Sequence, residues 1–172
     1  MKKLLLLLGV AGLFFFATSC TDHDGDGMLA QTDRDFMMKA AESNLFEVKA
    51  GEMAAGKAAA DSVRHYGMHM VNDHGMAGME MKALAQKKMV MLPETLSPAK
   101  QMKLDSLAMM TGMKFDSVYM AMMVISHVET IDQFRLETTL GKDPEVKSFA
   151  EGKLPVLNHH LEEAIRLKEW LW

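Results

Sequence analysis

Apolar residues recur at intervals of three and four positions through most of the chain, which is the period of an amphipathic helix. Alternating runs rich in valine, isoleucine and threonine, which are typical of strands, do not interrupt this pattern. Turn and capping residues divide it into five expected helices: Thr32 to about Ala55, Asp61 to about Lys87, Ser97 to near Thr111, about Lys114 to Leu140, and Asp143 to Trp172. The last of these contains Pro155, where we expect a kink.

Four of these segments are long and one is short. Thr32 and Asp61 are expected to cap the first two helices through their side chains. Ser97 and Asp143 each precede a proline at the first helical position, where the fixed backbone angle favours a helix. Short turns join the first long pair and the second long pair, and a long crossover that contains the short helix connects the two pairs. This order predicts an all-α fold, a single ferritin-like four-helix bundle formed by residues 32–172.

The N-terminal residues have the composition of an export signal. Two lysines precede an almost unbroken apolar run, which is too short for a stable membrane span and ends in small residues, so we expect residues 1–19 to be a signal peptide. Cys20, the single cysteine, follows directly and resembles the modified residue of a bacterial lipobox. We therefore expect lipid on Cys20, a tether over residues 20–31, and a site in the cell envelope, as an outer membrane lipoprotein that faces the periplasm or the cell surface. The alternative is an ordinary signal peptide with an incidental cysteine.

Charge restricts the partners of the processed chain. Removal of the two N-terminal lysines leaves 17 basic residues against 23 acidic ones, a formal net charge of −6. A nucleic acid is not an expected partner, because phosphate binding requires a basic face. Asp22, Asp24 and Asp26 match the first half of a calcium-binding loop, but Asp33 stands where a bidentate glutamate belongs. The expected contacts are instead the membrane, through the lipid, and an envelope protein.

One titratable residue lies near the middle of the apolar stripe of each long helix: Glu47, His74, His127 and His160. Midpoints of equally long, roughly parallel or antiparallel helices lie at similar heights, so the four side chains are expected to meet inside the bundle. Glu47 fits least well, because its distance from the first turn implies an offset of about 7 Å from His74. Imidazoles and a carboxylate at one level would suit a zinc, copper or iron ion, with Glu47 or Asp73 as a further ligand.

A polar cluster without a metal is the alternative. In that interpretation Asp73, Asp116 and Tyr119 are hydrogen-bond partners that fix the register of the helices. Asp116 cannot bind an ion together with His127, since eleven helical residues separate the two by about 16 Å. A ferritin-type di-iron centre is not expected either, because no glutamate stands three residues before any of the three histidines.

Weaker metal candidates lie elsewhere in the sequence. His65 and His69 stand four residues apart on one helical face, with Asp61 one turn earlier. The chain has 19 methionines, whose thioethers favour Cu(I), although methionine also fills helical cores. No serine lies in a nucleophile elbow and no glycine-rich phosphate loop is present, so we assign no catalytic residue.

The same positions carry a family resemblance. In order along the chain they are Glu47, Met70-Val71-Asn72-Asp73-His74, Gly112-Met113-Lys114-Phe115-Asp116 with Tyr119 and His127, and Leu154-Pro155 with His160-Leu161. The pattern resembles the domain-of-unknown-function family 4142, often labelled a predicted outer membrane protein, over roughly Asp33 to Lys168. The resemblance implies a ferritin-like bundle exported to the bacterial envelope and supplies no established activity. The richness in methionine departs from the family pattern.

Three functional hypotheses follow. The first is a lipid-anchored envelope protein that binds a transition metal through the histidines inside the bundle. The second is a non-catalytic structural, interaction or stress module, in which the buried polar cluster only sets helix register. The third is an enzyme that uses the site as a hydrolytic or redox centre, which would require an open coordination position and a substrate cleft.

Overall fold

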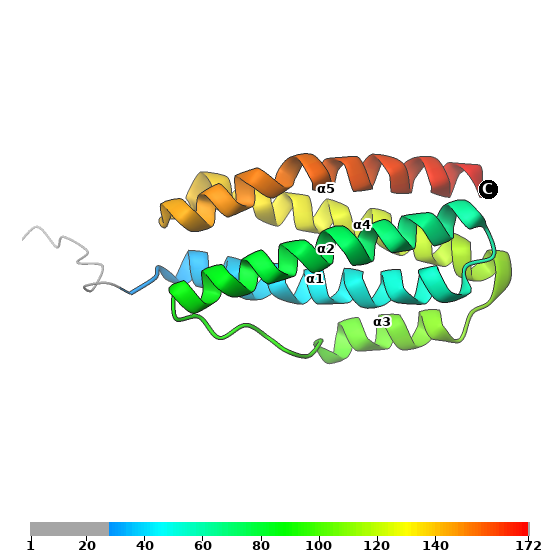
Figure 1. The fold of residues 1–172 in the computed structure, drawn as a ribbon, viewed down its shortest axis with the longest axis horizontal. Coiled ribbons are helices and arrows are strands. Elements are labelled where there is room, and N and C mark those ends of the chain that lie inside the picture. Colours follow the sequence, from blue (N-terminus) through cyan, green and yellow to red (C-terminus); the bar gives the residue numbers. More distant parts are fainter. Residues whose placement is uncertain (1–27, 172) are drawn as a thin grey trace, which may run out of the picture.

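Five helices account for nearly all of residues 28–171, the part of the chain that this computed structural model describes (Figure 1). They are α1 (Gln31–Lys57), α2 (Asp61–Lys87), α3 (Pro98–Ala108), α4 (Gly112–Leu140) and α5 (Pro144–Trp170). The expected signal peptide, the expected lipidation site Cys20 and the tether as far as residue 27 lie outside the described residues. No helix within the described range is long and apolar enough to cross a bilayer.

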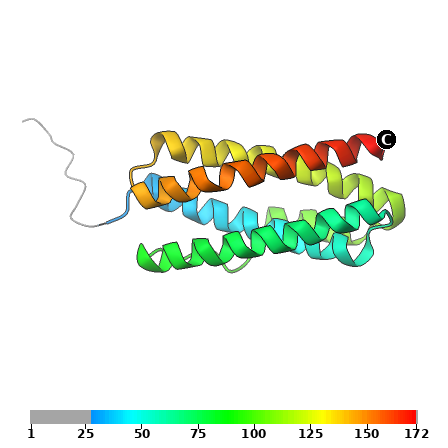
Figure 2. The ribbon, with the colours of Figure 1, turned by 45° about the horizontal axis from the view of Figure 1, so that its top comes forward.

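The long helices form two antiparallel hairpins, α1 with α2 and α4 with α5, which lie side by side in both views (Figures 1 and 2). Across the hairpins α1 packs against α4 and α2 packs against α5. The connection from α2 to α4 returns along the length of the bundle and contains α3, which lies beside α1 (Figure 1). The expected all-α, ferritin-like bundle with one long crossover is therefore confirmed.

The helix caps differ from the expectation. Thr32 and Asp61 lie inside the first turns, because the N-cap residues are Ala30 and Ala60, and neither of these two helix starts has a side-chain cap within residues 28–171. Asp116 instead holds the turn before α2, since its carboxylate accepts the backbone N–H groups of Ala59 and Ala60 at 2.9 and 2.7 Å. A contact supplied by another helix leaves no local signal in the sequence.

The start of α5 follows its sequence signal closely. The Asp143 carboxylate accepts the N–H groups of Glu145 and Val146, and Pro144 occupies the first helical position. The helix then continues through Pro155, which is exposed. An exposed proline is tolerated there because solvent can hydrogen-bond the carbonyl group that loses its helical partner.

Two glycines allow α1 and α2 to approach closely. A Cβ atom on Gly67 would lie 2.8 Å from the carbonyl oxygen of Gly51 and 2.8 Å from the backbone nitrogen of Ala55. Backbone atoms cannot move aside as a flexible side chain can, so only glycine fits at this crossing. The contact fixes α1 against α2 one turn from Glu47 and two turns from His74.

The apolar core is divided into two clusters. The first includes Phe46, Ala50, Tyr66, Met70, Phe115, Tyr119, Met123 and Ala164. The second includes Phe36, Met37, Met81, Ile131, Phe134, Val146 and Leu157. Along the helices these clusters are separated by the buried polar residues Glu47, His74, Ser126, His127 and His160. A polar layer therefore interrupts the core near the middle of the bundle.

Candidate metal centre

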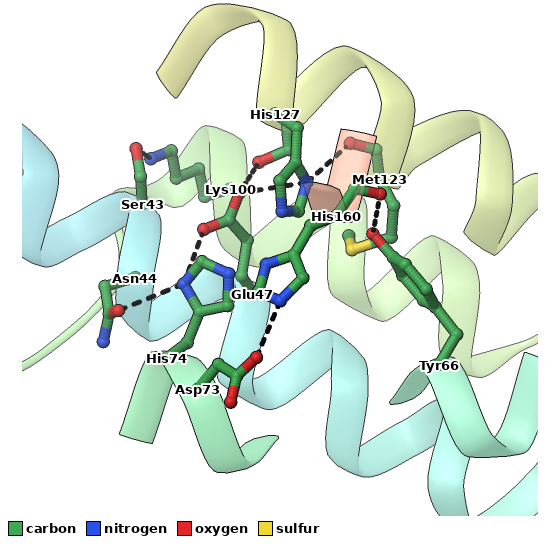
Figure 3. A network of polar contacts seen from close by, with 11 residues as sticks. Ser43, Asn44, Glu47, Tyr66, Asp73, His74, Lys100, Met123, His127 and His160 are labelled. Carbon is green, nitrogen blue, oxygen red and sulfur yellow. Dashed lines mark hydrogen bonds and ion pairs between the residues drawn. The ribbon is translucent and has the colours of Figure 1, made fainter. Parts of the chain in front are cut away.

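Three histidines from three helices meet in this layer (Figure 3). His74 lies on α2, His127 on α4 and His160 on α5, with 5%, 0% and 2% of their surface exposed. One ring nitrogen of each lies within 4.8 Å of those of the other two. Each histidine stands near the middle of an apolar stripe, and helix packing buries it together with that stripe.

Each ring is held by one of its two nitrogens. His127 Nδ1 lies 2.9 Å from the Met123 carbonyl oxygen, and His160 Nε2 lies 2.8 Å from Asp73 Oδ2. His74 Nδ1 lies 3.2 Å from Asn44 Oδ1 and 3.2 Å from Glu47 Oε2. All of these partners are acceptors, so the contacting ring nitrogen is the one that carries the proton in a neutral imidazole.

The other nitrogen of each ring is consequently a lone-pair acceptor. His74 Nε2, His127 Nε2 and His160 Nδ1 are buried and have no hydrogen-bond partner among the described residues. In Figure 3 these three nitrogens face one another. Converging lone pairs in a dry interior repel one another, and each buried acceptor lacks a hydrogen bond. A cation bound between the three nitrogens would remove the repulsion and give each lone pair a partner.

The spacing is close to that of a metal site. Three nitrogens at a tetrahedral zinc ion stand about 3.3 Å apart, since each bond is about 2.0–2.1 Å long. The upper limit of 4.8 Å in the structure requires a contraction of about 1.5 Å or less, which side-chain rotation can supply.

Glu47 lies behind the rings and does not face the other nitrogens. Its two oxygens are 3.2 Å from His74 Nδ1 and 3.7 Å from His127 Nδ1, and the Ser126 hydroxyl donates to Oε1 at 2.8 Å. Burial alone would raise the pKa of Glu47, but the two histidines and Ser126 together lower it. The residue is thus a buried carboxylate that orients two imidazoles and increases their basicity.

The offset along the bundle that the sequence predicted between Glu47 and His74 was too large. Helix α1 ends at Lys57 and α2 begins at Asp61, so Glu47 and His74 stand ten and thirteen residues from the connecting turn. This reduces the offset to about 4.5 Å, which a glutamate side chain can bridge. Asp73 occupies an equivalent place behind His160. Both carboxylates are therefore placed to support the histidines and not as direct ligands.

Burial also sets the protonation of the rings. It lowers the pKa of His74, although the Glu47 carboxylate opposes this change. It lowers the pKa of His160 to about 4, against the hydrogen bond to Asp73. Both rings are therefore neutral at neutral pH, and the neutral imidazole is the form that binds a metal ion.

Asp116 and Tyr119, which we expected to support the cluster, have other contacts. Asp116 holds the turn between α1 and α2 through the backbone of Ala59 and Ala60. The Tyr119 ring stacks on Phe115, with ring centroids 6.0 Å apart, and its buried hydroxyl lacks a hydrogen-bond partner within the described range. Neither side chain hydrogen-bonds to a histidine.

Three contacts of the centre were missed in the sequence. Asn44 and Ser126 were passed over because short polar residues in a helix are usually solvated, although Asn44 stands one turn before Glu47. The carbonyl of Met123 has no sequence signal at all, since any residue four positions before a histidine supplies one.

The other expected metal candidates are weaker in the structure. His65 and His69 are exposed, and His69 Nδ1 lies 3.7 Å from Glu163 Oε2. Among residues 28–171 the three buried histidines alone form a group of three potential ligands close enough to share an ion. Met70 and Met123 pack in the apolar core. The first three acidic positions of the calcium-type loop fall outside the described residues, and Asp33 accepts backbone N–H groups of Lys142 and Asp143.

Comparisons with known proteins give a family and a fold. The family model described as "Domain of unknown function (DUF4142)" matches residues 18–167. No curated protein matches the sequence. The structure is similar to the "Crystal structure of DUF305 fragment from Deinococcus radiodurans", with a TM-score of 0.71 and 11% sequence identity over 84% of this chain and 97% of that chain. At this identity the likeness supports the fold alone.

Proposed function

Because this chain belongs to the DUF4142 family of unknown function, we propose its role from its own residues: it binds one transition-metal ion through His74, His127 and His160 inside the bundle. The observation that carries the proposal is the set of three buried ring nitrogens that face one another without a hydrogen-bond partner in the described range. The opposite nitrogen of every ring already has an acceptor, so each free nitrogen is presented as a ligand.

The donor set restricts the ion. Imidazole nitrogen suits zinc, copper and iron, whereas calcium and magnesium require oxygen ligands. The carboxylates of Glu47 and Asp73 contribute negative charge close to the ion without occupying a coordination position. They would partly neutralise a divalent ion in an interior that otherwise disfavours charge.

The cellular setting is part of the proposal. The apolar N-terminal run and Cys20 support export and lipid attachment, which would place the metal centre in the cell envelope on a tether. Replacement of Cys20 by Ala should then move the chain from the membrane fraction to the soluble envelope fraction. An unchanged membrane association would contradict the lipid anchor and leave the metal proposal unaffected.

The experiment on the metal is a measurement of ion content. The full chain, purified without chelator, should contain close to one zinc, copper or iron ion per molecule by plasma mass spectrometry. His127→Gln should lose the ion, whereas His65→Gln, which changes an exposed histidine, should keep it. Circular dichroism shows whether the variants stay folded, and His160→Asn tests the same centre from another helix.

A second candidate function is an interaction or stress module without a metal. The polar layer favours it, because complementary buried hydrogen bonds between helices can fix their register. In that case a chelator would leave the melting temperature unchanged and zinc would not raise it. Under the metal proposal, saturation at 100 times Kd should add about 2.7 kcal/mol to the free energy of unfolding.

A further inference from the structure

A cavity of about 30 Å³ lies beside His74 and His160 and is partly open to the surface. His74, His160 and Glu47 line one part of it. Much of the remaining wall is apolar and comes from Ala40, Ala77, Met81, Phe134 and Leu157, while Asn44, Asp73, Thr130 and Lys153 add polar groups. A pocket at this place gives a small molecule access to the proposed ion.

The protein supplies three ligands and does not supply a fourth among the described residues. The nearby carboxylates of Glu47 and Asp73 lie on the protonated sides of the rings, 3.2 Å from His74 Nδ1 and 2.8 Å from His160 Nε2. Zinc and copper commonly have four ligands, and sites with three protein ligands complete the set with a molecule from solution. The coordination chemistry therefore points to one ligand from outside the chain.

Thr130 gives an independent indication of that ligand. Its side chain lines the same cavity, and the hydroxyl oxygen is buried without a hydrogen-bond partner in the described part of the chain. Thr130 stands one turn after His127 on α4, with only 3% of its surface exposed. A buried hydroxyl is normally satisfied, so a molecule in the cavity would be its natural partner.

The size and polarity of the cavity define the class of ligand. A water molecule requires about 10–15 Å³ by this measure, so the space accepts a water or a diatomic molecule and excludes larger substrates. The cavity disfavours an anion, because the carboxylates of Glu47 and Asp73 lie on its wall and Lys153, its one lysine, is paired with Glu80 at 2.6 Å. A small uncharged molecule fits both conditions.

We infer that the ion binds one small uncharged ligand from solution, of the size of water or a diatomic gas, in the cavity that His74, His160 and Thr130 line. The inference rests on the metal site proposed above. It makes the centre an open site with an exchangeable position and distinguishes it from a closed structural one.

Carbon monoxide bound to Cu(I) tests this inference, because it reports an open position by its infrared stretch. The full chain is loaded with Cu(I) without oxygen, its copper is counted, and carbon monoxide is added. We expect one copper per chain and a single carbonyl band. Ala77→Leu, which fills the cavity, should keep the copper and weaken carbon monoxide binding about tenfold or more. Ala83→Leu, on the exposed side of the same helix, is the matched control and should bind as the unmodified chain does.

The outcomes separate the two proposals. Absence of bound copper contradicts the metal site itself, and the inference falls with it. One copper per chain without a carbonyl band overturns the open position and leaves the metal site standing.

If Ala77→Leu does not fold, Ala40→Val fills the same cavity from α1, and an unweakened band in that variant places the ligand elsewhere. Thr130→Val should keep the copper and shift the band, and an unshifted band contradicts the role of the hydroxyl.

Discussion

A buried carboxyl group at the end of α4 predicts how the stability of the protein depends on pH. Glu137 has only 4% of its surface exposed and lies beside the buried carboxylate of Asp33. Burial, followed by the hydrogen bond to Asp33 and its negative charge, raises the pKa of Glu137 from 4.5 to about 8. At neutral pH this glutamate is therefore largely protonated in the folded protein and ionised in the unfolded chain.

The sign of the effect follows from proton binding. Between pH 4.5 and about 8 the folded state holds more protons than the unfolded state. The contribution of Glu137 to the free energy of unfolding is therefore complete below pH 4.5 and is lost as the pH rises through 8. A change of one pKa unit corresponds to about 1.4 kcal/mol. Between pH 7 and pH 9 the free energy of unfolding should fall by about 1.4 kcal/mol if the helix end stays rigid. Relaxation of the helix end reduces the expected fall to about 1 kcal/mol.

Urea unfolding at pH 7, 8 and 9, followed by circular dichroism in the presence of a chelator, measures this loss. Every other titratable group is the same in Glu137→Gln, so the difference between the two proteins isolates the contribution of Glu137. Glu137→Gln keeps the shape and the hydrogen-bond donor but cannot ionise, and its free energy of unfolding should stay level over the same range. Parallel curves for the two proteins would refute the reasoning.

Three further predictions concern the framework and the centre. Gly67→Ala should lower the free energy of unfolding by about 2–3 kcal/mol, because the added Cβ clashes with backbone atoms of α1. Gly152→Ala, whose Cβ would meet nothing within 4 Å, should not destabilise the protein. Equal melting temperatures for the two variants would contradict the close helix crossing. Asp116→Ala should cost about 2–4 kcal/mol in urea unfolding, because two backbone N–H groups lose their acceptor, and a loss under 1 kcal/mol would show that solvent replaces it. Glu47→Gln should weaken metal binding about 10–100-fold in calorimetry at unchanged stoichiometry, with exposed Glu52→Gln as control; equal affinities would remove Glu47 from the centre.

The sequence predicted the helices well because their signals are local. Period, proline and glycine placed the helix ends within a few residues, and the long crossover followed from the order of the segments. The three histidines could be brought together because each stands near the middle of an apolar stripe, where a bundle must bury it.

The remaining contacts could not be predicted because they join residues far apart in the chain. Asp116 binds the backbone of Ala59, 57 residues away, and no local pattern marks that partner. The same reason explains Glu47: its role depends on which atoms of His74 and His127 face it, and that is decided by side-chain rotation after packing.

X-ray absorption of the zinc-loaded full chain tests the central claim most directly, because it counts the atoms bound to the ion. The account predicts a four-coordinate ion with three imidazole nitrogens at about 2.0 Å and one oxygen ligand from solution. A six-coordinate shell of oxygen atoms, or fewer than three imidazoles, would contradict an ion shared between the three helices.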